Sequence, residues 1–509
     1  MSKGARKQIS RSSRDAFSAK VRRRLASEAG AIRSEGAFNA ALVYPSPYNA
    51  GMSSLGYQRI YRALRETPGF GCERAFLDDD AVAGEPSSGL LTYESMRPVR
   101  DFPVFAVSVA YELEIAGLVQ CLQAASIPVL REERSERDPF VLGGGPLTFS
   151  NPTPLGAICD AVIMGEAEAL VVEVMRTLEA TPKRADQLVA LAKLDHVWVP
   201  EIHGETLASL CQCADALLPA WGGLRAKETE LSEMFLIETS RGCSRGCTYC
   251  VMRRSTNGGM RIVPDNVILE TIPSDARRVG LVGAAVSDHP RIVSIVNTLA
   301  DRGCEVGLSS LRPDKLKIDF VTALKRVGYR TLTTAMDGPS ERVRKQLDRR
   351  AEIRHLLTAA ENARAAKMDR LKLYLMIGLP GETDADIDEC VGFTTELSRV
   401  VPVALGIAPF CPKRNTPLVD AVYAGVDVVE HRLDRLKRGL KGRADVRTTS
   451  AKWAWIEALL AKGGVAHGRA IVDAVAGGAT FAAYRRALAD LPSIAAPPRT
   501  FSLPVVTSP

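Results

Sequence analysis

Three cysteines, Cys243, Cys247 and Cys250, stand close together in the middle of the chain with the spacing C-x3-C-x2-C. Three thiolates on one short loop can wrap a cubane iron–sulfur cluster and ligate three of its four irons. The fourth iron then keeps an open position, which a metal needs in order to bind a substrate. The alternative is a structural zinc site, which takes four ligands, and no fourth Cys or His lies close by along the chain. The spacing therefore predicts a cluster with one open iron.

The residues around these cysteines add a family resemblance. The segment Arg241–Cys250 follows a predicted strand at Phe235–Thr239, and Tyr249 directly precedes the third cysteine. Over roughly residues 234–425 the chain resembles the radical S-adenosylmethionine (SAM) superfamily. The resemblance implies a 4Fe-4S cluster, SAM bound at its open iron, and reductive cleavage of SAM to a 5′-deoxyadenosyl radical that abstracts hydrogen from a substrate. It also implies an electron donor such as flavodoxin or ferredoxin, and it leaves the substrate unknown.

The resemblance extends to the ends of later strands, where members of the superfamily contact SAM. Leu371–Glu382 (LKLYLMIGLPGE) resembles the fifth-strand motif, in which glycines allow a tight turn. An ordinary strand–loop–helix turn with Thr383 as the helix cap is the plainer interpretation. The positions implied to bind SAM are Tyr249, Gly283, Ala284, Ser310, Arg312, Gly378 and Pro380.

Two of these positions leave alternatives open. The stretch that begins at Gly283 lacks the glutamate with which the superfamily holds the amino group of the methionine moiety, so Ser287, Asp288 or backbone carbonyls would have to replace it. Arg312 could pair with the methionine carboxylate in a fork geometry, or form a surface salt bridge. Asp337–Arg344 resembles the acid-x-x-Ser-x-Arg-x-Arg stretch of a subfamily that carries an additional N-terminal domain.

Cys411 follows the sixth predicted strand, so it should lie at the mouth of the barrel. A thiol at this place could be a catalytic residue that donates a hydrogen atom or bonds to substrate. More often such a cysteine is simply a small buried residue. Both interpretations of Cys411 remain open from the sequence.

The cysteine loop and the predicted SAM positions can lie together only if the strands that precede them are parallel, because the carboxyl ends of parallel strands share one edge. Parallel strands require helices between them. Apolar runs and helical patterns alternate six times in this region, which predicts a partial (β/α)6 barrel with its active site at the carboxyl ends of the strands. The predicted strands are Phe235–Thr239, Val279–Val282, Glu305–Ser310, Arg330–Ala335, Leu371–Ile377 and Val403–Ala408.

A second strand–helix series precedes the barrel and predicts a doubly wound, Rossmann-like parallel sheet. Its predicted strands are Asn39–Tyr44, Phe102–Tyr111, Phe140–Gly143 and Ala161–Met164, with helices at Leu55–Arg65 and Leu113–Ala125. The region resembles the cobalamin-binding-type domain of the same subfamily, with Ser108, Gly143, Gly144 and Gly145 as the implied cobalamin positions. None of the six histidines lies within residues 39–180, so the Asp-x-His-x-x-Gly motif that ligates cobalt is absent. One alternative is that cobalamin binds without a lower histidine, in which case methyl transfer through it is possible. The other is that the domain kept the fold and lost the cofactor.

Two other functions remain possible on the sequence. An RNA-modifying, methylthiotransferase-like enzyme would need three further cysteines on strand-end loops, for which Cys72, Cys121 and Cys159 are the only candidates. A non-catalytic iron–sulfur redox or regulatory protein would keep the cluster without cleaving SAM.

The 509 residues suggest two or three domains. We expect a basic tail (1–38), the Rossmann-like domain (39–180), a linker (181–233), the barrel (234–425), a small helical C-terminal region (426–492) and a disordered tail (493–509). Residues 1–38 hold ten basic and three acidic residues, an excess equal to the net charge of +7 of the whole chain. This segment could bind RNA, or be a solvated extension or surface helix. No apolar run reaches the roughly 18–20 residues of a membrane span, so we expect a cytoplasmic protein.

Overall fold

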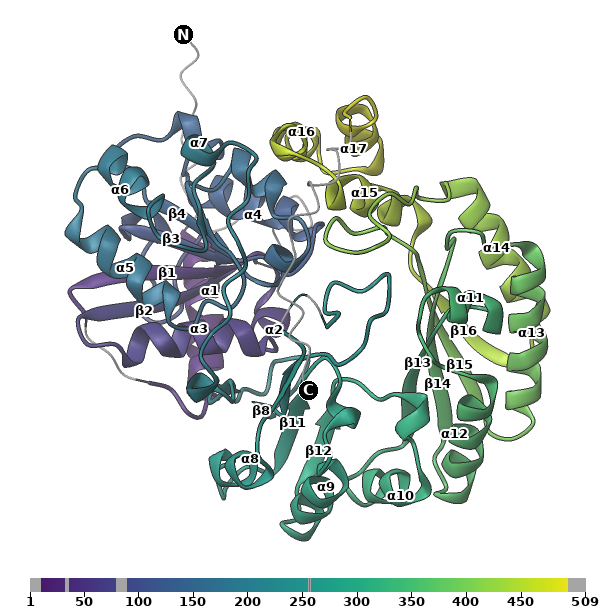
Figure 1. Cartoon of the computed structure of the whole chain (residues 1–509). Coiled ribbons are helices and arrows are strands. Elements are labelled where there is room, and N and C mark those ends of the chain that lie inside the picture. Colours follow the sequence, from purple (N-terminus) through teal and green to yellow (C-terminus); the bar gives the residue numbers. More distant parts are fainter. Residues whose placement is uncertain (1–10, 33–35, 79–88, 255, 257, 493–509) are drawn as a thin grey trace, which may run out of the picture. The chain divides into compact units, whose positions relative to one another are not determined.

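The computed structural model describes residues 11–32, 36–78, 89–254, 256 and 258–492 (Figure 1). It forms two compact units. The first unit contains the chain up to Met234 together with Gly463–Pro492, and the second contains Phe235–Lys462. The second unit is therefore an insertion in the chain of the first. The predicted tail 493–509 lies outside the described residues.

One sheet organises the first unit. Its strand order is β2-β1-β3-β4-β5-β6, and the first five strands run parallel while β6 pairs antiparallel with β5. The order 2-1-3-4-5 is that of a doubly wound fold whose strand order reverses between β1 and β3. The strands are β1 (Phe38–Tyr44), β2 (Phe70–Phe76), β3 (Val104–Ser108), β4 (Phe140–Gly144), β5 (Ala161–Ile163) and β6 (Val197–Trp198). The predicted Rossmann-like sheet is present, with β2 and β6 in addition to the expected strands.

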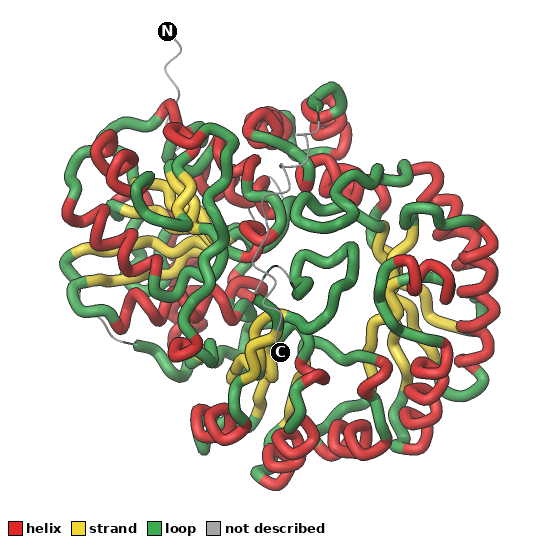
Figure 2. Tube along the Cα trace, in the orientation of Figure 1, coloured by secondary structure: helices red, strands yellow, loops and turns green. Residues whose placement is uncertain are grey.

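Helices pack on both faces of this sheet (Figure 2). Alternate strand residues such as Leu42 and Ala106 share one core cluster with Leu64 of α3 and Val174 of α5. Their neighbours Val43 and Phe105 are equally buried, which explains why the strands are continuous apolar runs. The helices are α2 (Tyr48–Gly51), α3 (Leu55–Glu66), α4 (Glu114–Ala124), α5 (Leu170–Ala180), α6 (Arg184–Leu191) and α7 (Pro200–His203), and a short strand β7 (Trp221–Gly222) follows them.

The basic N-terminus differs from the expected tail, as far as it is described. Residues Arg11–Ala26 form helix α1, in which Val21 is fully buried in the core cluster of the first unit. The guanidinium of Arg24 contacts Glu228 at 3.0 Å and the Tyr93 hydroxyl at 2.7 Å. Part of the positive charge is thus used inside the fold, because a helix with one apolar side and anchored arginines can pack against the sheet.

The predicted helical C-terminal region divides between the two units. Helices α16 (Val465–Ala476) and α17 (Phe481–Leu488) belong to the first unit. There Gly468 permits a close approach, since a Cβ at this position would lie 2.0 Å from the Pro154 carbonyl oxygen. Helices α14 (Val426–Gly439) and α15 (Ala451–Ala461) belong to the second unit, where strand β16 (Ala444–Thr448) also lies. The sequence pattern did not predict β16.

The second unit contains a curved series of parallel strands with helices on its outer side (Figure 1). Strands β8, β11 and β12 pair in parallel, and β13, β14, β15 and β16 form a second parallel sheet. The strands are β8 (Phe235–Glu238), β11 (Arg278–Val282), β12 (Glu305–Leu308), β13 (Thr331–Asp337), β14 (Arg370–Ile377) and β15 (Val403–Pro409). The helices are α8 (Asp265–Thr271), α9 (Ile292–Asp301), α10 (Ile318–Arg326), α11 (Glu341–Gln346), α12 (Ile353–Ala365) and α13 (Asp384–Ser398). All six predicted barrel strands are present.

The two sheets of the second unit are joined by hydrogen bonds outside the strand ladders. The Thr334 hydroxyl in β13 donates to the Leu311 carbonyl at 2.7 Å, and the Leu308 N–H donates to the Tyr329 hydroxyl at 2.6 Å. These bonds tie the carboxyl end of β12 and the segment after it to Tyr329, just before β13, and to the middle of β13. Among the described helices, none combines the length and the apolar character that crossing a membrane requires.

We predict that Glu28→Gln destabilises the first unit by about 1–3 kcal/mol, because the buried Arg74 guanidinium loses its bidentate partner and keeps one carboxylate, that of Glu94 at 2.6 Å. The Glu28 and Arg74 side chains are 1% and 2% exposed, and their closest contact is 2.8 Å. Hydrogen exchange of β2, which carries Arg74, measures the loss. Glu66→Gln is the control, since its partner Arg62 lies on the same helix surface and such a pair contributes about 0.3–0.5 kcal/mol. Equal protection of β2 in both variants would contradict the prediction.

Candidate functional site

The cysteine loop is closed at its base by a small antiparallel ribbon. Strand β9 (Ser240–Gly242) directly precedes Cys243, and β10 (Met260–Ile262) follows the loop. Gly242 pairs with Met260 and Ser240 pairs with Ile262. Gly242 has φ +78°, a conformation that favours glycine at the point where the chain leaves the strand. The ribbon therefore holds both ends of the loop beside the carboxyl end of β8.

The tip of the loop rests on the turn after α11. The Thr248 N–H donates to the Leu347 carbonyl at 3.1 Å. The Cys247 sulfur lies 3.8 Å from the Asp348 carbonyl oxygen, and a Cβ at Gly246 would lie 3.2 Å from an Asp348 carboxylate oxygen. A loop that begins at the first barrel strand is thus seated on the connection that follows the fourth.

The three cysteines provide a donor set that fits the predicted cluster. All three are free thiols, with Cys247 buried and the other two half-buried. Burial raises the pKa of Cys243 and Cys247 and raises that of Cys250 to about 11. Within the described ranges, no three Cys, His, Asp or Glu side chains converge on a position for a single metal ion. Three sulfur donors on one loop match the ligand requirement of an iron–sulfur cubane.

Tyr249 connects the loop to the inner side of the barrel. It packs against the hydrophobic cluster of Val343, Leu347, Leu379 and Phe410, of which Leu379 follows β14 and Phe410 follows β15. Burial and the nearby Asp337 carboxylate raise the pKa of Tyr249. The structure thus brings Tyr249 together with the fifth-strand motif and with the residue that precedes Cys411.

A buried ion pair lies beside Tyr249 and Cys247. Arg349 pairs with Asp337 at the end of β13 and donates to the Ala335 carbonyl at 3.2 Å. Asp337 has φ +65°, which is uncommon for a residue with a side chain. Burial alone would lower the pKa of Arg349, but Asp337 outweighs it and raises that pKa. Sequence reasoning missed Arg349, although the run Asp348-Arg349-Arg350 could have marked it.

Two of the predicted SAM positions meet at the ends of β11 and β12. The Ser310 hydroxyl donates to the Gly283 carbonyl at 3.1 Å and accepts the Val286 N–H at 3.0 Å. Gly283 is needed for packing, since a Cβ there would lie 2.9 Å from the Ser240 carbonyl oxygen. Ala284 is exposed beside them. Ser310 therefore shapes the turn after the second barrel strand, where the superfamily's glutamate is missing.

Arg312 is a buried residue with protein partners rather than a surface residue. Its guanidinium contacts Asp314 at 2.8 Å and Asp288 at 3.2 Å. The Arg312 N–H also donates to the Ser287 hydroxyl at 3.0 Å. A ligand carboxylate would have to compete with these two aspartates for the guanidinium. The predicted contact between Arg312 and the methionine carboxylate stays a prediction.

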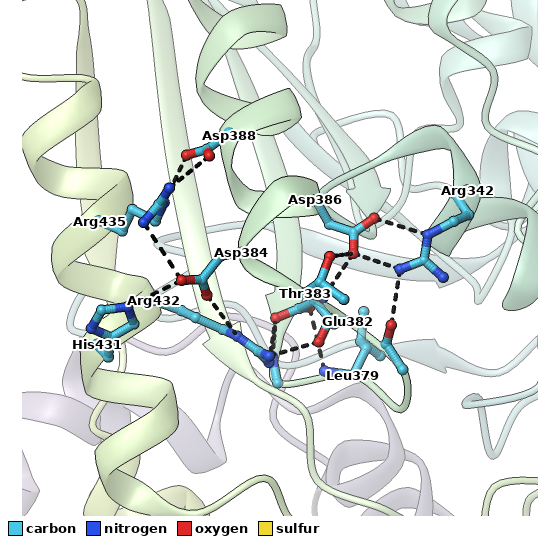
Figure 3. A network of polar contacts seen from close by, with 12 residues as sticks. Arg342, Leu379, Glu382, Thr383, Asp384, Asp386, Asp388, His431, Arg432 and Arg435 are labelled. Atoms are coloured by element: carbon cyan, nitrogen blue, oxygen red, sulfur yellow. Dashed lines mark hydrogen bonds and ion pairs between the residues drawn. The ribbon is translucent and has the colours of Figure 1, made fainter.

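The fifth-strand motif forms a turn around a buried carboxylate (Figure 3). The fully buried Glu382 side chain accepts the Gly378 N–H at 2.8 Å and the Leu379 N–H at 3.3 Å, and contacts the Arg432 guanidinium at 2.9 Å. Burial raises the pKa of Glu382, although these donors oppose the rise. Gly378 has φ +78°, so the turn requires glycine there. Glu382 therefore fixes the position of Gly378 and, two residues on, Pro380.

A second carboxylate joins this turn to α11. Asp386 accepts the Thr383 N–H and hydroxyl at 2.8 Å, and it accepts the Ser340 hydroxyl at 2.6 Å (Figure 3). Burial alone would raise the pKa of Asp386, but hydrogen bonds from Arg342, Ser340 and Thr383 outweigh it and lower that pKa. Thr383 is the N-cap of α13, as the plainer interpretation expected. The Asp337–Arg344 stretch is thereby tied to the fifth-strand motif.

Cys411 lies just after β15 and is half-buried. Its thiol is 3.3 Å from the Ala454 carbonyl oxygen of α15. Phe410, its neighbour, belongs to the cluster that contains Tyr249. The structure places Cys411 next to this cluster, and its catalytic role stays a prediction.

The predicted cobalamin positions lie together at the carboxyl edge of the first unit's sheet. Ser108 pairs with Gly144, and Gly145 has φ +101°. Added Cβ atoms would lie 2.9 Å from the Cys159 sulfur at Gly143 and 2.7 Å from the Val109 nitrogen at Gly145. At Gly144 the nearest atom would be 3.8 Å away. Packing of the protein itself thus explains two of these glycines, whereas a Cβ at Gly144 would make only an ordinary van der Waals contact.

The crevice between β1 and β3 is bridged by a buried carboxylate. Glu114 accepts the Ala110 N–H at 2.7 Å and the Ser46 hydroxyl at 3.1 Å. Burial raises the pKa of Glu114. Residues 39–180 contribute no imidazole to this edge, since they contain no histidine. They therefore do not fit a cobalamin that takes its lower ligand from a histidine of this segment.

Comparison with known proteins decides the family. The family described as "Radical SAM superfamily" matches residues 237–394, and "Radical SAM proteins, N-terminal" matches residues 56–200. The chain belongs to the radical SAM superfamily. This confirms the predicted enzyme class, and with it a 4Fe-4S cluster and SAM as the cofactors of the family. Most of the described site lies within the second match.

Three similar proteins extend the comparison. An uncharacterized protein of Methanocaldococcus jannaschii is 25% identical over 388 residues, 74% of this chain and 78% of that protein. The ribosomal protein uS12 methylthiotransferase RimO of Desulfosudis oleivorans is 26% identical over 176 residues, 31% of this chain and 40% of RimO. The structure of the cobalamin-dependent SAM radical enzyme OxsB with aqua-cobalamin bound has TM-score 0.50 and 11% identity, and the match covers 79% of this chain and 56% of OxsB. The likeness to OxsB confirms the predicted fold class.

We predict that Glu382→Gln weakens SAM binding by roughly tenfold, equivalent to about 1.4 kcal/mol. In the variant, the NH2 group of the new amide faces a buried donor, either a backbone N–H or the Arg432 guanidinium, without an acceptor between them. This loosens the turn that carries Gly378 and Pro380. Calorimetric titration of SAM into anaerobically reconstituted protein measures the affinity. Asp388→Asn is the matched control, because Asp388 pairs with Arg435 on α14, the helix that also carries Arg432, but is 55% exposed. If Glu382→Gln bound SAM as tightly as Asp388→Asn, the turn would have no part in holding SAM.

Proposed function

We propose that this radical SAM enzyme cleaves SAM reductively at a 4Fe-4S cluster held by Cys243, Cys247 and Cys250, and uses the resulting 5′-deoxyadenosyl radical to abstract hydrogen from a substrate. When bound, the cluster supplies one electron and an open iron for SAM, with a donor such as flavodoxin or ferredoxin providing the electron. The observation that carries the proposal is a loop with three free thiols, pinned by β9 and β10 at the carboxyl end of β8.

The surrounding residues support this chemistry by holding the loop and excluding water. Tyr249, within the loop, packs against the hydrophobic cluster that contains Leu379 and Phe410. Asp337 holds the Arg349 guanidinium beside Cys247. This charge does not open the site to solvent, because the Arg349 side chain is only 8% exposed. Glu382 and Ser310 fix the two turns at which we expect SAM to be bound.

We predict that Cys243→Ala, Cys247→Ala or Cys250→Ala each lowers bound iron to background and abolishes 5′-deoxyadenosine formation. Each variant leaves two sulfur donors, too few to hold three irons of a cubane. Iron analysis, Mössbauer spectroscopy and product chromatography after anaerobic reduction measure the effect. Cys304→Ala removes a buried thiol of the same unit that contacts the Ala276 carbonyl, and it should keep the cluster. Absence of deoxyadenosine from cluster-loaded wild-type protein would refute the proposal.

Cobalamin-dependent methyl transfer is a second candidate. It is supported by the likeness in fold to OxsB and by the doubly wound strand order, in which ligands bind at the carboxyl edge. A Cβ at Gly144 would meet no atom closer than 3.8 Å, so the backbone of this edge is not crowded there. Because residues 39–180 offer no imidazole, we assign no reaction step to cobalamin. Any cobalamin bound here would lack a histidine from residues 39–180 as its lower ligand.

We predict that hydroxocobalamin, if the second candidate is right, co-elutes with wild-type protein and is lost in Gly144→Val. The fold tolerates a Cβ at this position, and the valine side chain would lie on the strand edge at which cobalamin is expected. Gel filtration with absorbance detection measures retention, and circular dichroism checks the fold. Wild-type protein that retains no cobalamin would remove this candidate and leave the radical chemistry untouched.

An RNA-modifying, methylthiotransferase-like function has less support, despite the similarity to RimO. Cys72 lies within β2, Cys121 lies within α4 and Cys159 precedes β5, so none follows the carboxyl end of a strand. Burial raises the pKa of all three thiols, and that of Cys159 to about 12. All three cysteines are fully buried in the packing of the first unit, and none lies on a loop at the carboxyl end of a strand, where a second cluster would be held.

A further inference from the structure

A cavity of about 620 Å³ opens on the flank of the cysteine loop, within the second unit. Its size is that of a small-molecule site. None of the seven positions predicted to bind SAM lines it, although the lining residue Asp288 is one of the possible replacements for the superfamily's missing glutamate. The lining residues are Ser244, Arg245, Arg254, Gly258, Gly259, Met260, Ile262, Asp288 and Lys315.

The charges of this cavity do not balance. Arg245, Arg254 and Lys315 are cationic, and Asp288 is the only acidic lining residue. Arg254 and Lys315 are exposed, and neither forms an ion pair with another described residue. The cavity therefore carries an excess of two positive charges, which a ligand can neutralise.

Asp288 fixes the cavity wall. Its side chain is 7% exposed, and one carboxylate oxygen lies 3.2 Å from the Arg312 guanidinium and 3.4 Å from the Ser244 hydroxyl. The other oxygen is buried and has no hydrogen-bond partner among the described residues. Arg245 lies 3.7 Å from the same carboxylate and 3.5 Å from Asp314. The cysteine loop and the ends of β11 and β12 thus form one charged framework in which Arg254 and Lys315 remain available.

We propose that this cavity binds the phosphate group of a small phosphate monoester. A monoester carries about −1.5 to −2 charges at pH 7, which matches the excess of the lining, whereas a carboxylate would neutralise only half of it. Guanidinium groups suit phosphate because they donate two parallel hydrogen bonds. Met260 and Ile262, the latter 47% exposed, provide apolar surface for the organic part of the ligand. The proposal adds a second binding site to the proposed function and does not depend on radical chemistry.

The test is equilibrium binding of phenyl phosphate to the full chain, without SAM or reductant, followed by 31P NMR. Phenyl phosphate should bind wild-type protein at least about tenfold more tightly than benzoate, because its charge matches the cavity. The double variant Arg254→Ala/Lys315→Ala should weaken binding by about tenfold or more. Lys437→Ala/Arg438→Ala removes two exposed cations at the end of α14 and should leave the affinity unchanged. Lys315→Arg should retain most of the affinity.

Three results would overturn the proposal. The first is equal binding of phenyl phosphate by the Arg254→Ala/Lys315→Ala variant and wild type. The second is displacement of phenyl phosphate by stoichiometric SAM, which would make the cavity part of the SAM site. The third is binding of a single-stranded oligoribonucleotide through Arg254 and Lys315 while phenyl phosphate does not bind, which would indicate a nucleic-acid surface. Because the assay involves no SAM cleavage, its failure and that of the proposed function are distinguishable.

Discussion

The contact between the cysteine loop and the turn after α11 is the interaction on which the site depends. Strands β12 and β13 are not paired in a ladder, so the two sheets of the barrel need other connections. The loop provides one, because it starts beside the first strand and reaches the Leu347 carbonyl after the fourth. The placement of the three thiols and the closure of the barrel are therefore coupled, and a change in one alters the other.

The buried pair of Arg349 and Asp337 has a cost as well as a use. Removing two charges from water is expensive, and a buried ion pair is often no more stable than apolar residues of similar size. A packing role alone would be served as well by apolar side chains. The position of the pair beside Tyr249 and Cys247 offers a reason to retain it, because a guanidinium close to thiolates partly compensates the negative charge that ligand sulfurs bring into a poorly solvated place. Asp337 in turn limits how much positive charge Arg349 delivers.

The sequence was sufficient for features that depend on local pattern. The cysteine spacing, the six barrel strands and most strands of the first sheet each follow from periodicity and from turn residues. It was insufficient where distant segments meet. Strand β2 (FGCERAF) contains a charged pair that reads as exposed, yet Arg74 is buried because Glu28, from a segment read as a basic tail, neutralises it. Strand β16 and the return of α16 to the first unit depend on tertiary partners in the same way. Arg349 and Lys315 stand in ordinary polar stretches of the sequence. Their roles can be inferred only from the residues that the fold places beside them.

Buried carboxylates accept N–H groups at the strand ends of both units. In the second unit, Glu382 accepts the N–H groups of Gly378 and Leu379. In the first unit, Glu114 accepts the Ala110 N–H and Gly145 allows close packing of protein atoms, whereas a Cβ at Gly144 would meet no atom closer than 3.8 Å. A strand edge that binds a ligand needs polar groups that are not already bonded to the protein. An edge whose groups are all bonded to one another contributes to stability instead. By this criterion the chemistry of the chain is concentrated in the second unit, and the doubly wound unit contributes at most one open position of its own.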